Sequence, residues 1–417
     1  MTDARAAELV DGLLDSLRAA GPLRRVLLVP PDITRLHSGA GELTVLLYRR
    51  LSPSADVRVI PALGTHLPMS AAEMGLMYPG IPRDCFLVHN WRTDVVPRGE
   101  VPADFVAEVS EGRLRFPITC AVNRTLVEGG WDRIISIGQL VPHEIAGIAN
   151  FSKNILIGLG GPDTISKSHY VAAVYGLERL MGRLDSPMRR ILSWMDRHCI
   201  ADLPITYLMT VRGSQDGRTV TRGLFAGDDE RAYLAGAELC RAVAITDIGR
   251  PAAKVVAWMD ADEYHTTWVA NKAIYRTRMA VADGGELVVI APGVRQFGED
   301  QDTDALIRRI GYRSTAALIR LVESADITPA ELTAISHLIV SSPEERFRVT
   351  YAPGGLTPAQ TEAAGLSWGD PSELERRYDR SKLSEGWNTL PDGESIYFVP
   401  RPAAGLWTAG NRRQEGT

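Results

Sequence analysis

The sequence contains few cysteines, and their spacing excludes the sites that paired thiols form. Only four of its 417 residues are cysteine, at Cys85, Cys120, Cys199 and Cys240, and no two of them form a CxxC pair. Disulfide frameworks and thiolate metal sites both need several cysteines at suitable spacings. The cysteine content therefore indicates a reducing compartment and argues against both kinds of site.

Long apolar runs and an excess of positive charge are also missing. The apolar runs are too short to span a bilayer, and the N-terminus carries early acidic residues instead of the apolar stretch of a secretory signal. The net charge is −5, whereas proteins that bind nucleic acid present a positive field. We therefore expect a soluble, cytoplasmic protein with neither a membrane nor a nucleic acid as partner.

The common nucleotide-binding sequences are absent as well. No GxGxxG follows a predicted strand, and no GxxxxGK[ST] occurs. One glycine turn remains, from Gly158 to Gly161, and a helix is predicted to begin near Asp163. The N-terminus of that helix could bind a phosphate, or Asp163 could simply cap the helix.

What the sequence does contain is typical of a globular α/β protein. Apolar residues make up 45% and charged residues 23% of the chain, and 417 residues favour two or three domains over one. Buried strands alternate with amphipathic helices in both halves, a pattern that predicts parallel sheets. We expect two α/β domains with mostly parallel sheets, residues 1–245 and 246–417, and an active site in the cleft between them.

Three local predictions accompany this fold. The run SHLIVS at 336–341 reads as a buried strand. A hairpin turn is expected at Gln215-Asp216-Gly217, and disorder is expected beyond Ala409.

Polar residues follow the ends of the predicted strands in the first domain. Ligands bind at the carboxyl ends of strands in open α/β sheets, so these residues are candidates for a site. Each alone has an ordinary explanation, because a single loop histidine is usually a surface residue and a loop ion pair contributes little stability. The residues are Asp32, Thr34 and Arg35 after the first strand, His66 after the second, and His143 after the strand at 132–138.

A lysine and a further histidine follow His143 at fixed spacings. Lys153 comes ten residues after His143, and His169 comes sixteen residues after Lys153 on the helix that follows the glycine turn. Histidine can transfer protons near neutral pH and can ligate metals, and arginine and lysine can hold an anionic substrate. The group predicts a catalytic site whose reaction the residues alone leave open.

These residues resemble the nickel-dependent lactate racemase family, and more broadly the 2-hydroxyacid racemases and epimerases. The resemblance covers nearly the full chain, and its specificity comes from the ordered histidines and lysine at these spacings. It rests on Asp32-Ile-Thr34-Arg35, Gly64-Thr65-His66, His143-Glu-Ile-Ala-Gly147 with Lys153 and His169, Lys272 twelve residues ahead of Gly284-Gly285, and Pro391-Asp392-Gly393.

The resemblance implies a covalently bound cofactor. Family members carry a nickel-pincer nucleotide (pyridinium-3-thioamide-5-thiocarboxylic acid mononucleotide), and Lys153 is the position that would be joined to it through a thioamide. His169 would be the protein ligand to nickel, an ion that imidazole suits. Asp32, Thr34, Arg35 and Gly158 would help to hold the cofactor. The partners implied are the enzymes that make the cofactor and insert nickel.

The resemblance also implies a reaction. His66 and His143 would lie on opposite sides of a 2-hydroxy acid, and one would remove the hydroxyl proton as hydride leaves Cα for the cofactor. The resulting 2-keto acid would receive hydride on its other face, while the second histidine manages the reverse proton transfer. Arg35 and Lys272 would neutralise the substrate carboxylate or anchor the cofactor, and Trp268 would contact the substrate.

Two departures from the family pattern bear on the substrate. Ala149-Asn150-Phe151-Ser152 stands where the lactate enzymes have Ser-Gly-Gly-Arg, and Trp268-Val269 stands where they have Tyr-Gln. We therefore expect a 2-hydroxy acid other than lactate, such as a larger, sugar-derived acid. Two alternatives stay open: a non-catalytic homologue that binds a hydroxy acid or a metal, and a histidine-ligated metal hydrolase, which the absence of an HExxH motif disfavours.

Overall fold

The computed structural model describes residues 2–215 and 218–410, and their contacts divide them into two compact units. The first unit comprises the residues up to Ser168 together with Gly182–Ala244. The second comprises His169–Met181 and the residues from Ile245 onward. The short segment that begins at His169 thus groups with the second unit, although the sequence prediction placed it in the first domain. Asp216 and Gly217 of the predicted turn, and the predicted disorder from residue 411, lie outside the described residues.

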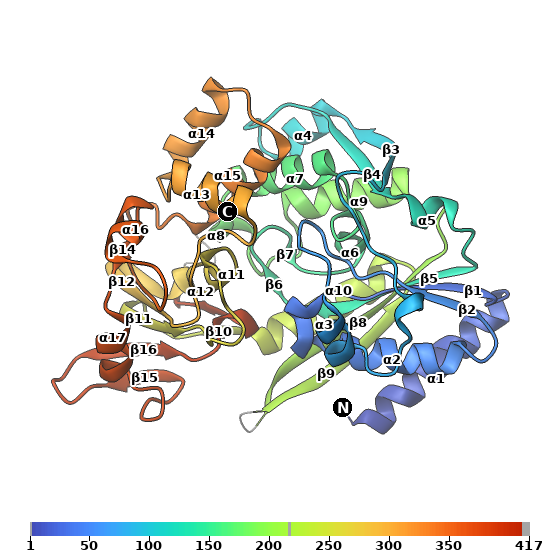
Figure 1. Cartoon of the computed structure of the whole chain (residues 1–417), viewed down its shortest axis with the longest axis horizontal. Helices are drawn as coiled ribbons and strands as arrows, with labels where there is room; N and C mark the ends of the chain where they lie inside the picture. The colour runs from blue at the N-terminus through green and yellow to red at the C-terminus, as the bar shows by residue number, and fades with distance from the viewer. Residues whose placement is uncertain (1, 216–217, 411–417) are drawn as a thin grey trace. The chain divides into compact units, whose positions relative to one another are not determined.

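The first unit is built on a five-stranded sheet in the order β2-β1-β5-β8-β9 (Figure 1). The first four strands run parallel, and β9 pairs antiparallel with β8. Their bounds are β1 Arg25–Val29, β2 Asp56–Val59, β5 Arg133–Leu140, β8 Ile205–Gln215 and β9 Arg218–Gly227.

Helices cover both faces of this sheet, and β1 accordingly buries four consecutive apolar residues, Val26 to Val29. On one face, α1 (Asp3–Ala20) and α2 (Ala40–Leu51) share a core with Val26 and Leu28 of β1. In Figure 1, α6 and α9 lie on the other side of the strands. The remaining elements of this unit are η1 Ile33–Ser38, α3 Ala71–Met77, η2 Arg83–Cys85, β3 Val95–Val101, α4 Ala103–Val109, β4 Ile118–Asn123, α5 Arg124–Glu128, β6 Pro142–His143, β7 Gly147–Ile148, α6 Ser152–Leu156, α9 Pro187–Cys199 and α10 Glu230–Ala244.

Two cysteines that are distant in the sequence approach each other in this unit. Gly99 of β3 is the strand partner of Cys120, and a Cβ on Gly99 would lie 3.0 Å from the sulfur of Cys199. A hydrogen bond with the Cys199 thiol and burial raise the pKa of the Cys120 thiol. Both cysteines are free thiols.

The second unit is built on a six-stranded sheet in the order β14-β13-β12-β11-β16-β15. All neighbours run parallel except β15 and β16. The predicted α/β class with mostly parallel sheets is therefore confirmed. The elements are α7 Pro162–Tyr175 (which begins in the first unit), α8 Leu177–Leu180, β10 Ile245–Asp247, β11 Ala252–Trp258, α11 Thr267–Ala270, α12 Lys272–Thr277, η3 Arg278–Ala280, β12 Val281–Ala291, α13 Gln301–Ile310, α14 Thr315–Ser324, α15 Pro329–Ser341, β13 Arg348–Pro353, α16 Pro358–Ala363, β14 Ser367–Trp368, α17 Pro371–Arg377, β15 Gly386–Thr389, β16 Ser395–Val399, η4 Pro402–Ala404 and β17 Leu406–Thr408.

The strand predicted at 336–341 is wrong, because these residues form the last turns of α15. A capping box between Thr328 and Glu331, with Pro329 at the first helical position, starts that helix. A short apolar run fits a buried helix as well as a buried strand, so the start signal upstream decides between them. Across the described residues, none of the helices combines the length and the apolar character that crossing a membrane requires.

Candidate active site

The loops after β1 and β2 are joined by one buried carboxylate. Asp32, only 4% exposed, caps the start of η1, where its Oδ1 accepts hydrogen bonds from the Thr34 amide at 3.1 Å and the Thr34 hydroxyl at 2.5 Å. Its Oδ2 lies 2.5 Å from Nδ1 of His66. Gly64, at φ 58°, makes the turn that brings His66 into this position.

The pKa of the Asp32 carboxyl determines where the proton lies in the pair of Asp32 and His66. Burial alone would raise the pKa of the Asp32 carboxyl, but the His66 imidazole and the Thr34 hydroxyl lower it to about 2. The carboxylate is therefore ionised at neutral pH and accepts the hydrogen bond from His66. The proton of His66 then lies on Nδ1, and Nε2 carries the lone pair of the neutral ring.

His143 is buried in the small β6–β7 hairpin that follows β5, with 5% of its surface exposed. Its Nδ1 accepts hydrogen bonds from the backbone N–H groups of Ile145 at 3.1 Å and Ala146 at 3.4 Å. The Glu144 carboxylate lies 3.8 Å from the same nitrogen. Because Nδ1 is the acceptor, the proton of the neutral ring lies on Nε2.

Lys153 lies in the first turn of α6, and several of these charged groups affect the pKa of its amine. Burial lowers the pKa of its amine to about 8, with the Arg35 and Arg189 guanidiniums acting in the same direction and the Glu144 and Asp32 carboxylates opposing them. An appreciable fraction of the amine is therefore neutral near pH 8. A neutral lysine amine is a nucleophile and can form an amide-type bond.

The backbone that leads into Lys153 adopts a conformation that favours glycine. Asn150 and Phe151 lie at φ 70° and 58°, and their sequence replaces the glycine pair of the family pattern. Non-glycine residues in this region cost on the order of 1–3 kcal/mol each, and they persist where the surroundings hold them. The Phe151 ring packs between Tyr207 at 4.3 Å and Tyr233 at 5.3 Å.

A buried arginine that sequence reasoning missed holds the same segment. Arg189 of α9 is 4% exposed, and it donates to the carbonyls of Ile148 at 2.8 Å and Asn150 at 3.3 Å. It also donates to the Ser152 hydroxyl at 3.5 Å and lies over the Tyr233 ring. The signal in the sequence is an arginine beside the apolar residues Met188, Ile191 and Leu192 of α9.

Replacing Arg189 by methionine should destabilise the protein by about 2–4 kcal/mol, because it removes a guanidinium that bonds to buried acceptors and leaves those acceptors unsatisfied. Denaturant unfolding of the two variants Arg189→Met and Arg190→Met measures the difference. Arg190 is the matched control, since its guanidinium is half-exposed and pairs with Asp185. Equal losses at both positions would contradict the assignment of Arg189 as a buried clamp.

Gly158, predicted to hold the cofactor, has a packing role in the structure. A Cβ at this position would lie 2.3 Å from the carbonyl oxygen of Asn154 and 2.6 Å from Cβ of Ala62. The Gly158 carbonyl accepts the amide of Gly64 at 2.8 Å, in the turn that carries His66. The glycine therefore allows the end of α6 and the loop after β2 to approach each other. Its contact with a cofactor stays a prediction.

We expect Gly158→Ala to lower the free energy of unfolding by about 1–3 kcal/mol, because the added methyl group meets backbone on one side and Ala62 on the other. Gly12→Ala in α1 is the control, since nothing lies within 4 Å of a Cβ there. That change should stabilise the protein by about 0.5–1 kcal/mol through helix propensity. Chemical denaturation of both variants measures these changes in the free energy of unfolding. A Gly158→Ala variant as stable as the wild type would contradict the packing role of Gly158.

Trp268 and Lys272, predicted to bind substrate, lie on α11 and α12 of the second unit. The Trp268 ring stacks on His337 of α15 with ring centres 4.0 Å apart and planes 17° apart. The Tyr275 hydroxyl lies 2.8 Å from Nδ1 of His337. Lys272 is 9% exposed, with its amine 5.7 Å from the centre of the Tyr264 ring. Sequence reasoning missed His337 because it assigned that segment to a strand.

His169, the predicted nickel ligand, lies on α7 in the segment that groups with the second unit. Within the described part of the chain, no group of three or more His, Cys, Asp or Glu side chains is placed to hold a metal ion. The ligation that the family resemblance implies takes one imidazole from the protein and the other donors from the cofactor, so it does not require such a group.

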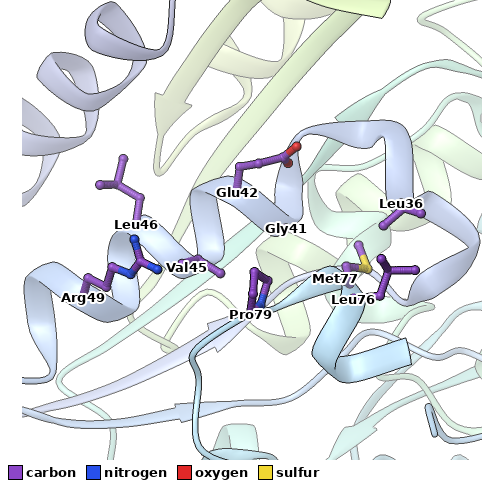
Figure 2. Close-up of a pocket in the computed structure, with 9 residues that line it drawn as sticks. All are labelled: Leu36, Gly41, Glu42, Val45, Leu46, Arg49, Leu76, Met77 and Pro79. Atoms are coloured by element: carbon purple, nitrogen blue, oxygen red, sulfur yellow. The ribbon is translucent and has the colours of Figure 1, made fainter. Parts of the chain in front are cut away.

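A cavity of about 360 Å³ lies beside η1, between α2 and α3 (Figure 2). Its walls are mainly apolar, with Glu42 and Arg49 as the charged residues among them, and none of the predicted site residues lines it. The lining residues are Leu36, Gly41, Glu42, Val45, Leu46, Arg49, Leu76, Met77 and Pro79.

Comparison with known proteins shows which proteins this chain resembles. Residues 13–178 match the model of the lactate racemase N-terminal domain. The chain is 23% identical over 394 residues to the lactate racemase of Thermoanaerobacterium thermosaccharolyticum, covering 89% of this chain and 84% of that protein. It is 25% identical over 206 residues to the lactate racemase of Lactiplantibacillus plantarum, covering 48% of this chain and 44% of that protein.

The chain resembles the lactate racemase family, and residues 13–178 match its N-terminal domain. The match to the second of these family members spans less than half the length of that protein.

Solved structures support the family fold. A protein from Thermotoga maritima superposes with a TM-score of 0.84 at 25% identity, over 98% of both chains. The apoprotein of the T. thermosaccharolyticum lactate racemase superposes with a TM-score of 0.67 at 18% identity, over 92% of this chain and 86% of that one. These superpositions show that the chain shares the fold of the lactate racemase apoprotein.

Proposed function

We propose that the protein inverts C2 of a 2-hydroxy acid other than lactate by way of a 2-keto acid. The observation that carries the proposal is the convergence, within one unit, of His66 and Asp32 with a lysine whose amine is desolvated. The charges of Asp32, which contacts His66, and of Glu144, which follows His143, both act on the Lys153 amine. Two imidazoles beside an attachment lysine suit removal and return of a hydroxyl proton.

A nickel-pincer nucleotide on Lys153 fits the residues present. The amine is neutral enough near pH 8 to form an amide-type bond, and Arg35 and Arg189 place positive charge near it, which suits a phosphate-bearing group. Asp32, Thr34, Arg35 and Gly158 would surround the cofactor, and His169 would ligate nickel. When bound, the cofactor supplies the acceptor and donor of hydride.

The protein's own part in the reaction is positioning and proton transfer. Arg35 and Lys272 would neutralise the substrate carboxylate. Trp268, held flat against His337, would offer an apolar face to the carbon chain of the substrate. Tryptophan and valine in place of tyrosine and glutamine support a substrate larger than lactate, such as a sugar-derived acid. The substrate would be a small molecule in the cytoplasm.

The deciding experiment produces the protein together with the enzymes of cofactor synthesis and nickel insertion. Intact mass, peptide mapping of Lys153 and nickel content are measured first. An added mass on Lys153 with near-stoichiometric nickel is the expected result. Chiral chromatography of a panel of 2-hydroxy acids then identifies the substrate, and lactate as the best substrate would overturn the substrate assignment.

The same samples separate the alternatives. An unmodified Lys153 in that setting would favour the binding homologue. Zinc bound to a protein with an unmodified Lys153 would favour the metal hydrolase.

A further inference from the structure

Two of the four cysteines form a buried pair that the candidate active site does not include. Cys120 is fully buried and lies in β4, directly opposite Gly99 of β3. Directly opposite residues of an antiparallel pair have their side chains on the same face of the sheet. Because Gly99 has no side chain, the sulfur of Cys199 fits beside it, 3.0 Å from where a Cβ would lie. The Cys120 side chain therefore points to the face on which the Cys199 sulfur lies.

The C-terminal end of α9 is held against β3 by contacts that do not involve the two sulfurs. Cys199 is the last residue of α9, and Arg98 of β3 donates from Nε to the Cys199 carbonyl at 3.0 Å. The same guanidinium binds the Asp202 carboxylate at 2.6 and 2.7 Å. These contacts keep Cys199 beside β3 while both cysteines are free thiols.

The two thiols differ in acidity. The hydrogen bond between them lowers the pKa of the Cys199 thiol, and the Arg98 guanidinium lowers it further although burial opposes both. The same hydrogen bond, with burial, raises the pKa of the Cys120 thiol. Cys199 is therefore the thiol that ionises first, and the thiolate is the form of cysteine that reacts with oxidants. Cys199 is 3% exposed, and the exposed residues 201 and 202 follow it closely along the chain.

We propose that Cys120 and Cys199 are a redox modification site, at which hydrogen peroxide joins the two sulfurs in a reversible disulfide. The Cys199 thiolate attacks one peroxide oxygen, which gives a sulfenic acid and hydroxide; the proton that Cys199 lost converts this hydroxide to water. The Cys120 sulfur then attacks the Cys199 sulfur, so that an S–S bond forms, the S–O bond breaks, and the hydroxyl leaves with the Cys120 proton as a second water. The two thiols together lose two electrons, which the peroxide gains.

The disulfide joins two elements that support the Lys153 segment. In β4, the Asn123 amide donates to the Leu159 carbonyl at 2.7 Å, beside the glycine turn. In α9, Arg189 holds the backbone just before Lys153. Disulfides that form in a reducing compartment are mostly transient and redox-sensing, so this bond is consistent with the low cysteine content. The inference does not depend on the proposed function, because it concerns residues and chemistry outside that reaction.

The first test treats the full-length chain with excess hydrogen peroxide, in a Cys85→Ser background that removes the partly exposed thiol. Trypsin digestion without reduction should yield peptides 116–124 and 198–212 joined by one disulfide, and the intact mass should fall by two hydrogen atoms. Because the bond closes a long loop, the thermal unfolding midpoint should rise by about 3–10 °C, and dithiothreitol should reverse every change. Survival of both thiols, or sulfinic acid on Cys199 without the joined peptides, would overturn the proposal.

The second test determines which sulfur reacts first. In Cys120→Ala the sulfenic acid on Cys199 has no partner, so dimedone should trap it. In Cys199→Ala, dimedone should label Cys120 at least about tenfold more slowly, because that thiol stays protonated. Cys240→Ala is the control, since it removes another buried cysteine and should leave the joined peptides unchanged. Thermal unfolding of each reduced variant checks its folding, and equal labelling of Cys120 and Cys199 would overturn the assignment of Cys199 as the attacking thiol.

Discussion

Lys153→Arg is expected to abolish covalent attachment of the cofactor and to lower the racemisation rate by at least about 10⁴-fold, to the assay background. Arginine keeps the positive charge and nearly the length of the side chain, but its guanidinium stays protonated and is a poor nucleophile. Peptide mass mapping of protein made with the cofactor enzymes should show no added mass on the segment that contains residue 153. Circular dichroism and thermal unfolding check that the variant is folded.

Lys167→Arg is the control for this change. Lys167 lies on α7, where its amine pairs with Asp163 at 2.8 Å and donates to the Pro117 carbonyl at 2.9 Å, both of which arginine can reproduce. Its activity and cofactor mass should match the wild type. A Lys153→Arg protein that still carries the cofactor mass would refute the attachment site, and full activity without the mass would refute the cofactor.

Asp32→Asn is expected to lower turnover by about 10²-fold while leaving cofactor attachment largely intact. The amide can still accept from Nδ1 of His66, but it lacks the charge that stabilises the imidazolium formed during proton transfer. The Thr34 hydroxyl holds the same carboxylate, so the loop should keep its conformation. Steady-state kinetics on the preferred acid, with kcat and KM separated, measures the effect, which should fall mainly on kcat.

The same substitution has a consequence for stability that depends on pH. The pKa of Asp32 is about 2 in the folded protein and 3.8 in the reference state, so its ionised form favours folding at every pH above 3.8. This contribution, about 2 kcal/mol at neutral pH, is lost in the wild type as the pH falls from about 4 to 2. Asp32→Asn should therefore be less stable at pH 7 and lose less stability on acidification. Equal stability of the two proteins at pH 7 would contradict the charge-stabilised pair.

Local signals in the sequence were sufficient for most of the first unit. Pro30 directly follows the apolar run of β1, and a capping box between Ser70 and Glu73 begins α3, and both signals are visible in the sequence. The strand expected at 336–341 was wrong because a short buried run carries the same pattern in a helix as in a strand. The capping box of Thr328 and Glu331 was the signal that would have corrected it.

In the candidate site as well, some features were predicted from the sequence and others were not. The order of His66, His143 and Lys153 was visible from their spacing after strand ends, because parallel strands bring such loops to one edge. Arg189 was invisible to that reasoning, since it comes from the middle of the chain and acts through backbone carbonyls that no sequence pattern records. The packing role of Gly158 was equally hidden, because only the folded chain brings Ala62 against it.

The sequence by itself determined the α/β class, the parallel sheets, the residue types at the strand ends and the resemblance to the lactate racemase family. These properties depend on local periodicity and spacing, which the linear order preserves. Only the tertiary structure decided the partners of those residues. The carboxylate on His66 and the carbonyl held by Arg189 lie 34 and 41 residues away along the chain, and Asp32 and Arg35 act on Lys153 from still farther away in the sequence. Proton location and charge state follow from such contacts, so they could not be read before the fold was known.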